Sequence, residues 1–138
     1  MPFPLRTKVE DSAGAARYAV SGDGPLLYIK DTALTTVGAG ALVAATLMSG
    51  LILRTGPTGA FADTIDTGAN LDAAFPNMAV GDTIDVYYSC SVAFASTITA
   101  NTGVTLRTAA ANNVIAASTG RLLHLEKTGT ATYDLYVI

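Results

Sequence analysis

One histidine stands among the few residues that could do chemistry. His124 is the only histidine of the chain, and Glu126 lies two positions further along. Side chains two apart on a strand share a face, so the sequence predicts a hydrogen-bonded or ion pair between them. A catalytic triad, a general acid–base pair or a histidine-based metal centre would need further partners, which the segment 121–127 does not supply. We therefore expect that the protein is not an enzyme.

Four aspartates form a second candidate cluster, because the word Asp-Thr-Ile-Asp occurs at 63–66 and again at 82–85. Paired carboxylates can bind Ca²⁺ or catalyse glycoside hydrolysis. A sheet with one wet and one dry face also requires Thr and Asp to alternate with Ile, and we favour this interpretation. The first copy precedes a helix cap and the second opens a strand, so we do not treat them as a repeat. We expect no bound metal.

Cys90 is the only cysteine, so no internal disulfide can form. It continues the apolar alternation of Ile84, Val86 and Tyr88, which predicts a small buried side chain rather than a reactive thiol. Tyr87 lies on the opposite, polar face of the same predicted strand, and we expect it to be exposed and to serve a subunit interface. The glycines form no phosphate-binding motif, so we expect no cofactor.

Composition favours a sheet protein that contacts other proteins. The 138 residues fit one domain, 50% of them are hydrophobic and only 14% are charged. Long exposed helices usually carry interspersed charges, so this profile favours strands. A surface with few charges can pack against protein without desolvating many ions. The net charge of −3 and the pI of about 4.8 predict no general attraction to nucleic acid.

The segment 32–53 is uncharged over a length that could cross a bilayer. Gly38, Gly40 and the pair Ser49-Gly50 interrupt it, and Thr and Ala dilute it. Two strands joined by a glycine-containing link fit this pattern better than a membrane span. We therefore expect a soluble protein without a membrane partner.

The elements that position these residues are predicted to be short strands. We expect an all-β fold, a β-sandwich or jelly-roll-like body over residues 25–138, with one short helix that Asp66 or Thr67 caps and Pro76 ends. Gly103 suits a positive φ in a short loop. Segment 41–48 suits a helix by its alanine content, but the pattern leaves it open. The expected strands are 26–30, 51–54, 83–90, 96–100, 104–107, 114–117, 120–126 and 130–138.

Residues 1–24 differ from the rest. Pro2, Pro4 and the turn-like run 21–25 argue against a packed helix, and we expect an extended N-terminal arm that orders against a partner. A flexible terminus without a partner is the alternative.

A pattern of turns and strands runs through residues 48–138: Ser49–Pro57, Asp63-Thr64, the helix end Ala73–Pro76, Val80–Asp82, Ala100–Leu106 and the closing strand Tyr133–Ile138. This pattern resembles small virion proteins of tailed bacteriophages, in particular capsid decoration (cement) proteins. The resemblance implies a β module that trimerises on the outer surface of the virion capsid, binds the major capsid protein and stabilises the shell. A receptor-binding or head-binding module of a tail fibre or spike, with a ligand on loops 55–60 and 108–113, is the alternative.

The resemblance also directs attention to two groups of residues. An arm laid across the shell would contact the capsid, and the subunits of a trimer would meet on the body. The expected capsid contacts are Phe3, Leu5, Arg6, Lys8 and Arg17, and the expected subunit-interface residues are Tyr87, Leu122 and His124.

Overall fold

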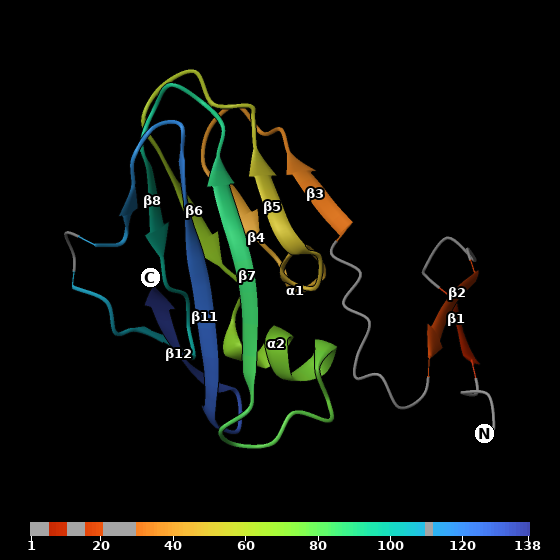
Figure 1. The fold of residues 1–138 in the computed structure, drawn as a ribbon. Helices are drawn as coiled ribbons and strands as arrows, with labels where there is room; N and C mark the ends of the chain where they lie inside the picture. The colour runs from red at the N-terminus through yellow and green to blue at the C-terminus, as the bar shows by residue number, and fades with distance from the viewer. Residues whose placement is uncertain (1–5, 11–15, 21–29, 110–111) are drawn as a thin grey trace.

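Two mixed β-sheets face each other across one hydrophobic core in the computed structural model (Figure 1), which describes residues 6–10, 16–20, 30–109 and 112–138. The six-stranded sheet contains, in spatial order, β3 (Lys30–Leu34), β5 (Gly50–Arg54), β7 (Thr83–Cys90), β11 (Thr119–Gly129), β12 (Thr132–Val137) and β9 (Val104–Leu106). The four-stranded sheet contains β10 (Val114–Ile115), β8 (Ser96–Thr99), β6 (Phe61–Ile65) and β4 (Gly40–Leu42). The expectation of a mostly β protein is confirmed.

The chain passes from the six-stranded to the four-stranded sheet four times, and the strands of the first three passages are stacked side by side. β3, β5 and β7 are parallel neighbours in one sheet, and β4, β6 and β8 are parallel neighbours in the other. Helix α1 (Ala44–Leu47) and helix α2 (Gly68–Ala74) lie on the two return paths. One strand of each sheet, with the segments that connect them, makes one winding of the chain. We call these windings the first coil (residues 30–49), the second coil (50–82) and the third coil (83–99). Because these pairs are parallel, the strand order does not show a jelly roll, whose strands are antiparallel.

The predicted alternation of β7 is confirmed and explains where the core lies. Val86, Tyr88 and Cys90 are fully buried between the sheets, whereas Asp85 and Tyr87 face outward. Apolar side chains on every second residue of a strand must leave water together, so this pattern fixes which face of the sheet turns inward.

The described part of the chain contains two short helices, where the sequence predicts one. The expected helix is α2, and Thr67 caps it by accepting a hydrogen bond from the N–H of Asn70 at 3.2 Å. The second is α1, a single turn within the segment that the pattern left open. Its first N–H, that of Ala44, donates to the carboxylate of Asp66 at 3.1 Å. In the described part of the chain, no helix is long and apolar enough to cross a membrane.

One predicted turn is confirmed, and another is placed differently from expectation. Gly103 has the expected positive φ of 80°, but the strands beside it, β8 and β9, belong to different sheets. The final turn was expected at 127–129, yet β11 continues to Gly129 with a register shift, and Ala131 supplies the turn with a φ of 52°. A chain that moves between two facing sheets cannot be told from a local hairpin by its turn residues alone.

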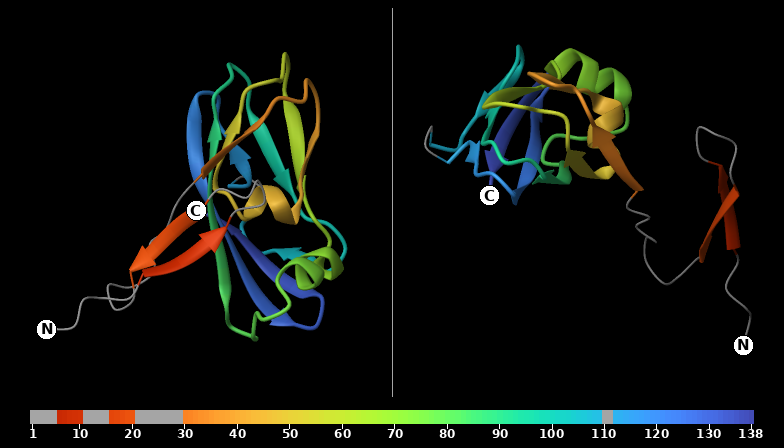
Figure 2. Two further views of the ribbon diagram at one scale, coloured as in Figure 1. Left: turned by 90° about the vertical axis from the view of Figure 1, so that its right-hand side faces the viewer. Right: turned by 90° about the horizontal axis from the view of Figure 1, so that it is seen from above.

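The described residues of the N-terminal arm form two strands that pair with each other. Its two described parts, β1 (Arg6–Glu10) and β2 (Ala16–Val20), pair as an antiparallel hairpin in which Arg6 lies opposite Val20. Figure 2 shows this hairpin as a sheet separate from the body. The expected first strand of the body began at residue 26, but residues 26–29 lie outside the described residues, and β3 begins at Lys30.

Candidate functional site

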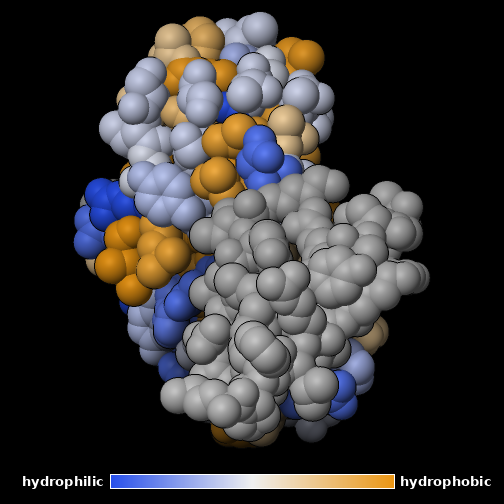
Figure 3. Space-filling view, turned by 45° about the vertical axis from the view of Figure 1, so that its right-hand side comes forward, coloured by the Kyte–Doolittle hydropathy of each residue, from blue (hydrophilic) through white to orange (hydrophobic). Residues whose placement is uncertain are grey.

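An apolar row crosses the outer face of the six-stranded sheet. Leu51 of β5 lies opposite Tyr87 of β7, which lies opposite Leu122 of β11. Ile138 continues the row, because its N–H and C=O pair with those of Leu122 at 2.9 and 3.0 Å. Tyr87 is 47% exposed and Ile138 is 65% exposed. We call these four residues the outer row; Figure 3 shows the outer face obliquely, with hydrophobic surface in orange beside the grey residues.

A glycine of β11 determines how Tyr87 lies. A Cβ atom at Gly120 would stand 2.4 Å from the Tyr87 hydroxyl, so the tyrosine ring covers the place where a side chain would be. The ring therefore lies along the sheet and exposes one flat side. Such a ring offers contact area at a low cost in conformational entropy.

His124 lies beside the outer row, but its partner is not the expected one. Its Nδ1 atom lies 2.5 Å from Oδ1 of Asp85, which is directly opposite on β7. The ring also packs against Tyr136 of β12, with 5.8 Å between the ring centroids. Glu126 instead lies opposite Thr83 and Asp134. The prediction of a His124–Glu126 pair is therefore wrong, because the cross-strand neighbour is closer than the neighbour along the strand.

The predicted interface residues thus meet in one place. Tyr87 and Leu122 are cross-strand partners, and His124 is the next residue of β11 on the same face. Of the expected capsid contacts, Phe3 and Leu5 lie outside the described residues. Arg6 and Lys8 lie on β1, and Arg17 lies on β2.

A buried ion pair that the sequence analysis missed lies on the inner side. Arg54 of β5 and Asp63 of β6 are both completely buried, and the Arg54 Nε lies 2.8 Å from Oδ2 of Asp63. The guanidinium also donates to the carbonyls of Leu34 at 3.0 Å, Thr36 at 2.6 Å and Gly38. Arg54 thereby ties the turn of the first coil to the second.

The third coil contributes to the same network. The Tyr88 hydroxyl donates to Oδ2 of Asp63 at 2.6 Å and lies 2.9 Å from the hydroxyl of Ser96. Burial and the hydrogen bond to Asp63 raise the pKa of Tyr88 far above its usual value. The N–H of Gly40 donates to Oδ1 of Asp63 at 2.8 Å, and a side chain at Gly40 would collide with that oxygen. Both oxygens of Asp63 are therefore fully used, which suits a structural role.

The period-two alternation of β5 and β6 could have predicted that both residues of this pair are buried. Arg54 shares a face of β5 with the buried Ile52, and Asp63 shares a face of β6 with Phe61 and Ile65. The wet-face interpretation of Asp63 is wrong, because a buried carboxylate is tolerated when a buried cation and hydrogen bonds satisfy it. The Arg54 guanidinium also stacks on the Phe61 ring, 4.8 Å from its centroid.

The other three aspartates of the repeated word have separate tasks. Asp66 accepts hydrogen bonds from Asn70 and the backbone of Ala44. Burial alone would raise the pKa of Asp66, but these bonds and one from Thr67 outweigh it and lower that pKa. Asp82 accepts from the N–H of Ala79 at 2.8 Å in a turn, and Asp85 binds His124. In the residues that the structure describes, no three His, Cys, Asp or Glu side chains gather as a metal site.

A further polar cluster joins α2 to the end of the six-stranded sheet. Asp72 lies 2.9 Å from the ammonium of Lys127 and accepts a hydrogen bond from the Tyr133 hydroxyl at 2.7 Å. The N–H of Ala131, in the strained turn, donates to the same carboxylate at 2.7 Å. These bonds, with the one from Lys127 the strongest, lower the pKa of Asp72 to about 2. Burial and the bond to Asp72 raise the pKa of Tyr133 well above its usual value.

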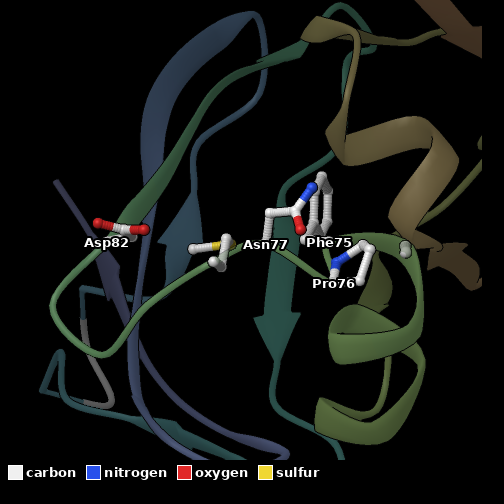
Figure 4. Close-up of a pocket in the computed structure, with 6 residues that line it drawn as sticks. Phe75, Pro76, Asn77 and Asp82 are labelled. Carbon is white, nitrogen blue, oxygen red and sulfur yellow. The ribbon is translucent and has the colours of Figure 1, made fainter.

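A surface pocket of about 360 Å³ lies after α2 and offers little chemistry. Its lining is Ala74, Phe75, Pro76, Asn77, Met78 and Asp82. Figure 4 shows Asn77 alongside the Phe75 ring, with Asp82 on the other side of the pocket. Asp82 is the one ionisable residue in this lining, and its carboxylate already binds the backbone of Ala79. The pocket therefore holds no pair of groups for acid–base catalysis.

Comparisons with known proteins leave the site to be judged on its own geometry. No protein-family model, no curated protein and no solved structure matches this chain.

Proposed function

We propose that the protein is a structural virion protein that binds the outer surface of a phage capsid as a homotrimer and stabilises the shell. The outer row is the observation that carries the proposal. Leu51, Tyr87, Leu122 and Ile138 form a continuous apolar strip on a sheet whose inner face is already packed. An exposed apolar strip that polar residues border is typical of a subunit contact.

The body suits a protein that bears load. We infer a β-sandwich, in which two facing sheets share one core and the Arg54–Asp63–Tyr88 network joins all three coils. A satisfied buried network gives stiffness because each group that moves would lose charge-assisted hydrogen bonds in a medium of low dielectric constant. Stiffness and contact area are what a shell-stabilising protein needs.

The hairpin supports contact with a partner by its charge. β1 and β2 together carry three basic residues, Arg6, Lys8 and Arg17, and one acidic residue, Glu10. Basic side chains on a two-stranded hairpin can pair with acidic groups on a neighbouring protein and raise the rate of association. On the capsid, the neighbouring protein would be the major capsid protein.

Mixing the purified protein with phage heads that lack a decoration protein tests the proposal. We expect stoichiometric binding, a higher temperature of head disruption, and a trimer by light scattering. The double variant Tyr87→Ser, Leu122→Asn should lose the trimer and weaken head binding, because it removes the two adjacent apolar side chains at the centre of the outer row.

Val80→Ser is the matched control, since Val80 is 67% exposed but lies in the turn before β7, away from the outer row. This variant should bind like the unmodified protein. Absence of head binding at micromolar concentration would sink the proposal. Binding to a glycan array that Tyr87→Ala abolishes would favour a receptor-binding module of a tail fibre or spike instead.

A further inference from the structure

The first coil leaves a strand edge without a neighbour. β3 is the end strand of the six-stranded sheet, and no other strand in the described part of the chain pairs with its far side. The N–H of Thr55 on the β5 side donates to the carbonyl of Leu34 at 3.2 Å. Since successive residues of a strand direct their backbone groups to opposite sides, the N–H and C=O of Asp31 and Ala33 point away from β5. These groups can accept an added strand.

The same coil carries an unusual share of exposed apolar side chains. Val37 and Met48 are each 64% exposed, and Val43 is 43% exposed. Val37 lies between β3 and β4, and the other two flank α1. Figure 1 shows β3 and α1 on the side of the body that faces the hairpin. An unpaired strand edge and exposed apolar side chains are both features that another chain can cover, and the first coil carries both.

The β1–β2 hairpin likewise lacks a neighbouring strand. Its two strands pair with each other and with no other strand of the described residues. An isolated two-stranded hairpin is marginal in water, and a third strand stabilises it. β1, β2 and β3 have five residues each, so the hairpin and the edge match in length.

Charge favours the same pairing. β1 and β2 hold three basic residues and one acidic residue, whereas residues 30–138 hold five basic and eight acidic residues. β3 itself carries one basic residue, Lys30, and one acidic residue, Asp31, which is exposed, so the charge argument rests on the body as a whole. Within one chain the hairpin and the six-stranded sheet are separate sheets, so the edge of β3 is open to a strand from another molecule.

We propose that the β1–β2 hairpin of one copy adds to the β3 edge of a second copy and continues the six-stranded sheet across the subunit boundary. The hairpin would supply backbone hydrogen bonds, and Val37, Val43 and Met48 would supply apolar area. The inference rests on the self-association in the proposed function but not on capsid binding.

Ala33→Pro tests the edge directly. Proline removes the outward N–H of Ala33 and leaves the hydrogen bonds between β3 and β5 in place, because these use the alternate residues. We expect the dissociation constant of self-association, measured by light scattering, to rise by about tenfold or more. Ala33→Thr keeps the N–H and is the matched control, so it should associate normally. Asp31→Lys and deletion of residues 1–24 should weaken association without altering β3, which covers the case that Ala33→Pro unfolds.

Hydrogen exchange of residues 30–34 separates the possible occupants. Pairing between copies predicts protection that increases with protein concentration and is lost on deletion of residues 1–24. Protection that is independent of concentration would mean that the hairpin docks on its own chain, and it would overturn the inference. Full self-association of both Ala33→Pro and the variant that lacks residues 1–24 would also overturn the inference. If these variants associated fully and also bound heads normally, the proposed function would be supported. Only the addition of the hairpin to the β3 edge of a second copy would then be contradicted.

Discussion

The two copies of Asp-Thr-Ile-Asp occupy opposite environments in the same molecule. Asp63, in the first copy, is completely buried on β6 and binds Arg54, Tyr88 and the backbone of Gly40. Asp85, in the second copy, lies on the outer face of β7, where its side chain is 53% exposed beside His124. The same four-residue sequence therefore contains a buried structural carboxylate in one copy, Asp63, and a surface carboxylate in the other, Asp85.

The difference shows that the neighbours in space decide what a carboxylate does. β6 has Arg54 in reach across a turn, so its inward carboxylate is matched by a buried cation. The strand β7 presents its aspartate outward, because Val86, Tyr88 and Cys90 hold the inward positions. The energies of these two carboxylates should differ accordingly, and the following variants measure how far.

Arg54→Met should have the largest effect. Removal of the guanidinium leaves the Asp63 carboxylate buried without a counter-charge, and we expect a loss of about 3–5 kcal/mol in the free energy of unfolding. Urea denaturation followed by circular dichroism measures it. The half-buried Arg121 provides the control Arg121→Met, which should cost much less. The double variant Arg54→Met, Asp63→Leu should recover part of the loss, and no recovery would contradict a role in charge compensation.

Adjacent tyrosines give the next comparison. Tyr88→Phe removes a hydrogen bond from both Asp63 and Ser96 in the buried network, which should cost about 1–3 kcal/mol. Tyr87→Phe, one residue away on the exposed face, should change the stability of the isolated protein by less than about 0.5 kcal/mol. Thermal and urea unfolding of both variants check this. Equal losses would show that the Tyr88 hydroxyl is not specially important.

Asp72 is intermediate between the two aspartates, because its side chain is 23% exposed beside Lys127. Its pKa is lowered to about 2 in the folded protein, against 3.8 in the unfolded chain. A depressed folded pKa adds stability above the unfolded value, and this contribution is lost as the pH falls from about 3.8 towards 2. Asp72→Asn should therefore be less stable than the parent at neutral pH, and the difference should shrink in that acid window. Denaturation at several pH values tests it, and a gap that persists down to pH 2 would contradict it.

The smallest effect is expected for Asp85→Asn. The Asp85 side chain is 53% exposed and that of His124 is 28% exposed, and ion pairs at the protein surface contribute about 0–1 kcal/mol. The free energy of unfolding at neutral pH should be almost unchanged. A loss as large as that of Arg54→Met would mean that the surface carboxylate is structurally equivalent to Asp63.

Local patterns predicted the elements better than their partners. The alternation of β7, the Thr67 cap and the positive φ of Gly103 follow from residue type and spacing, because each depends on interactions within a few residues. Strand β6 was not predicted, since Asp63 and Thr64 break its apolar pattern. Its carboxylate becomes suited to burial only next to Arg54, which the sequence places nine positions away but does not orient.

The candidate interface was predicted in part for the same reason. Tyr87 and Leu122 were expected on exposed or interface positions, and their direct pairing depends on the register of β7 with β11. The partner of His124 depends on that register too, so the sequence alone favoured the nearer Glu126. The pairing of β1 with β2 and the movement of the chain between two sheets depend on contacts between separate segments, which turn residues do not specify.

The stacked coils also have a consequence for folding kinetics. Each parallel pairing joins residues far apart in the chain, as with Leu51 and Tyr87 or Asp63 and Ile98. Such distant pairings require large loops to close, and the entropy lost on closure is offset only after the contacts form. We therefore expect folding in milliseconds to seconds rather than microseconds. The Arg54 network can form only when all three coils have met, so its contribution should act mainly on the rate of unfolding. The same buried ion pair would then make the folded protein long-lived as well as stable.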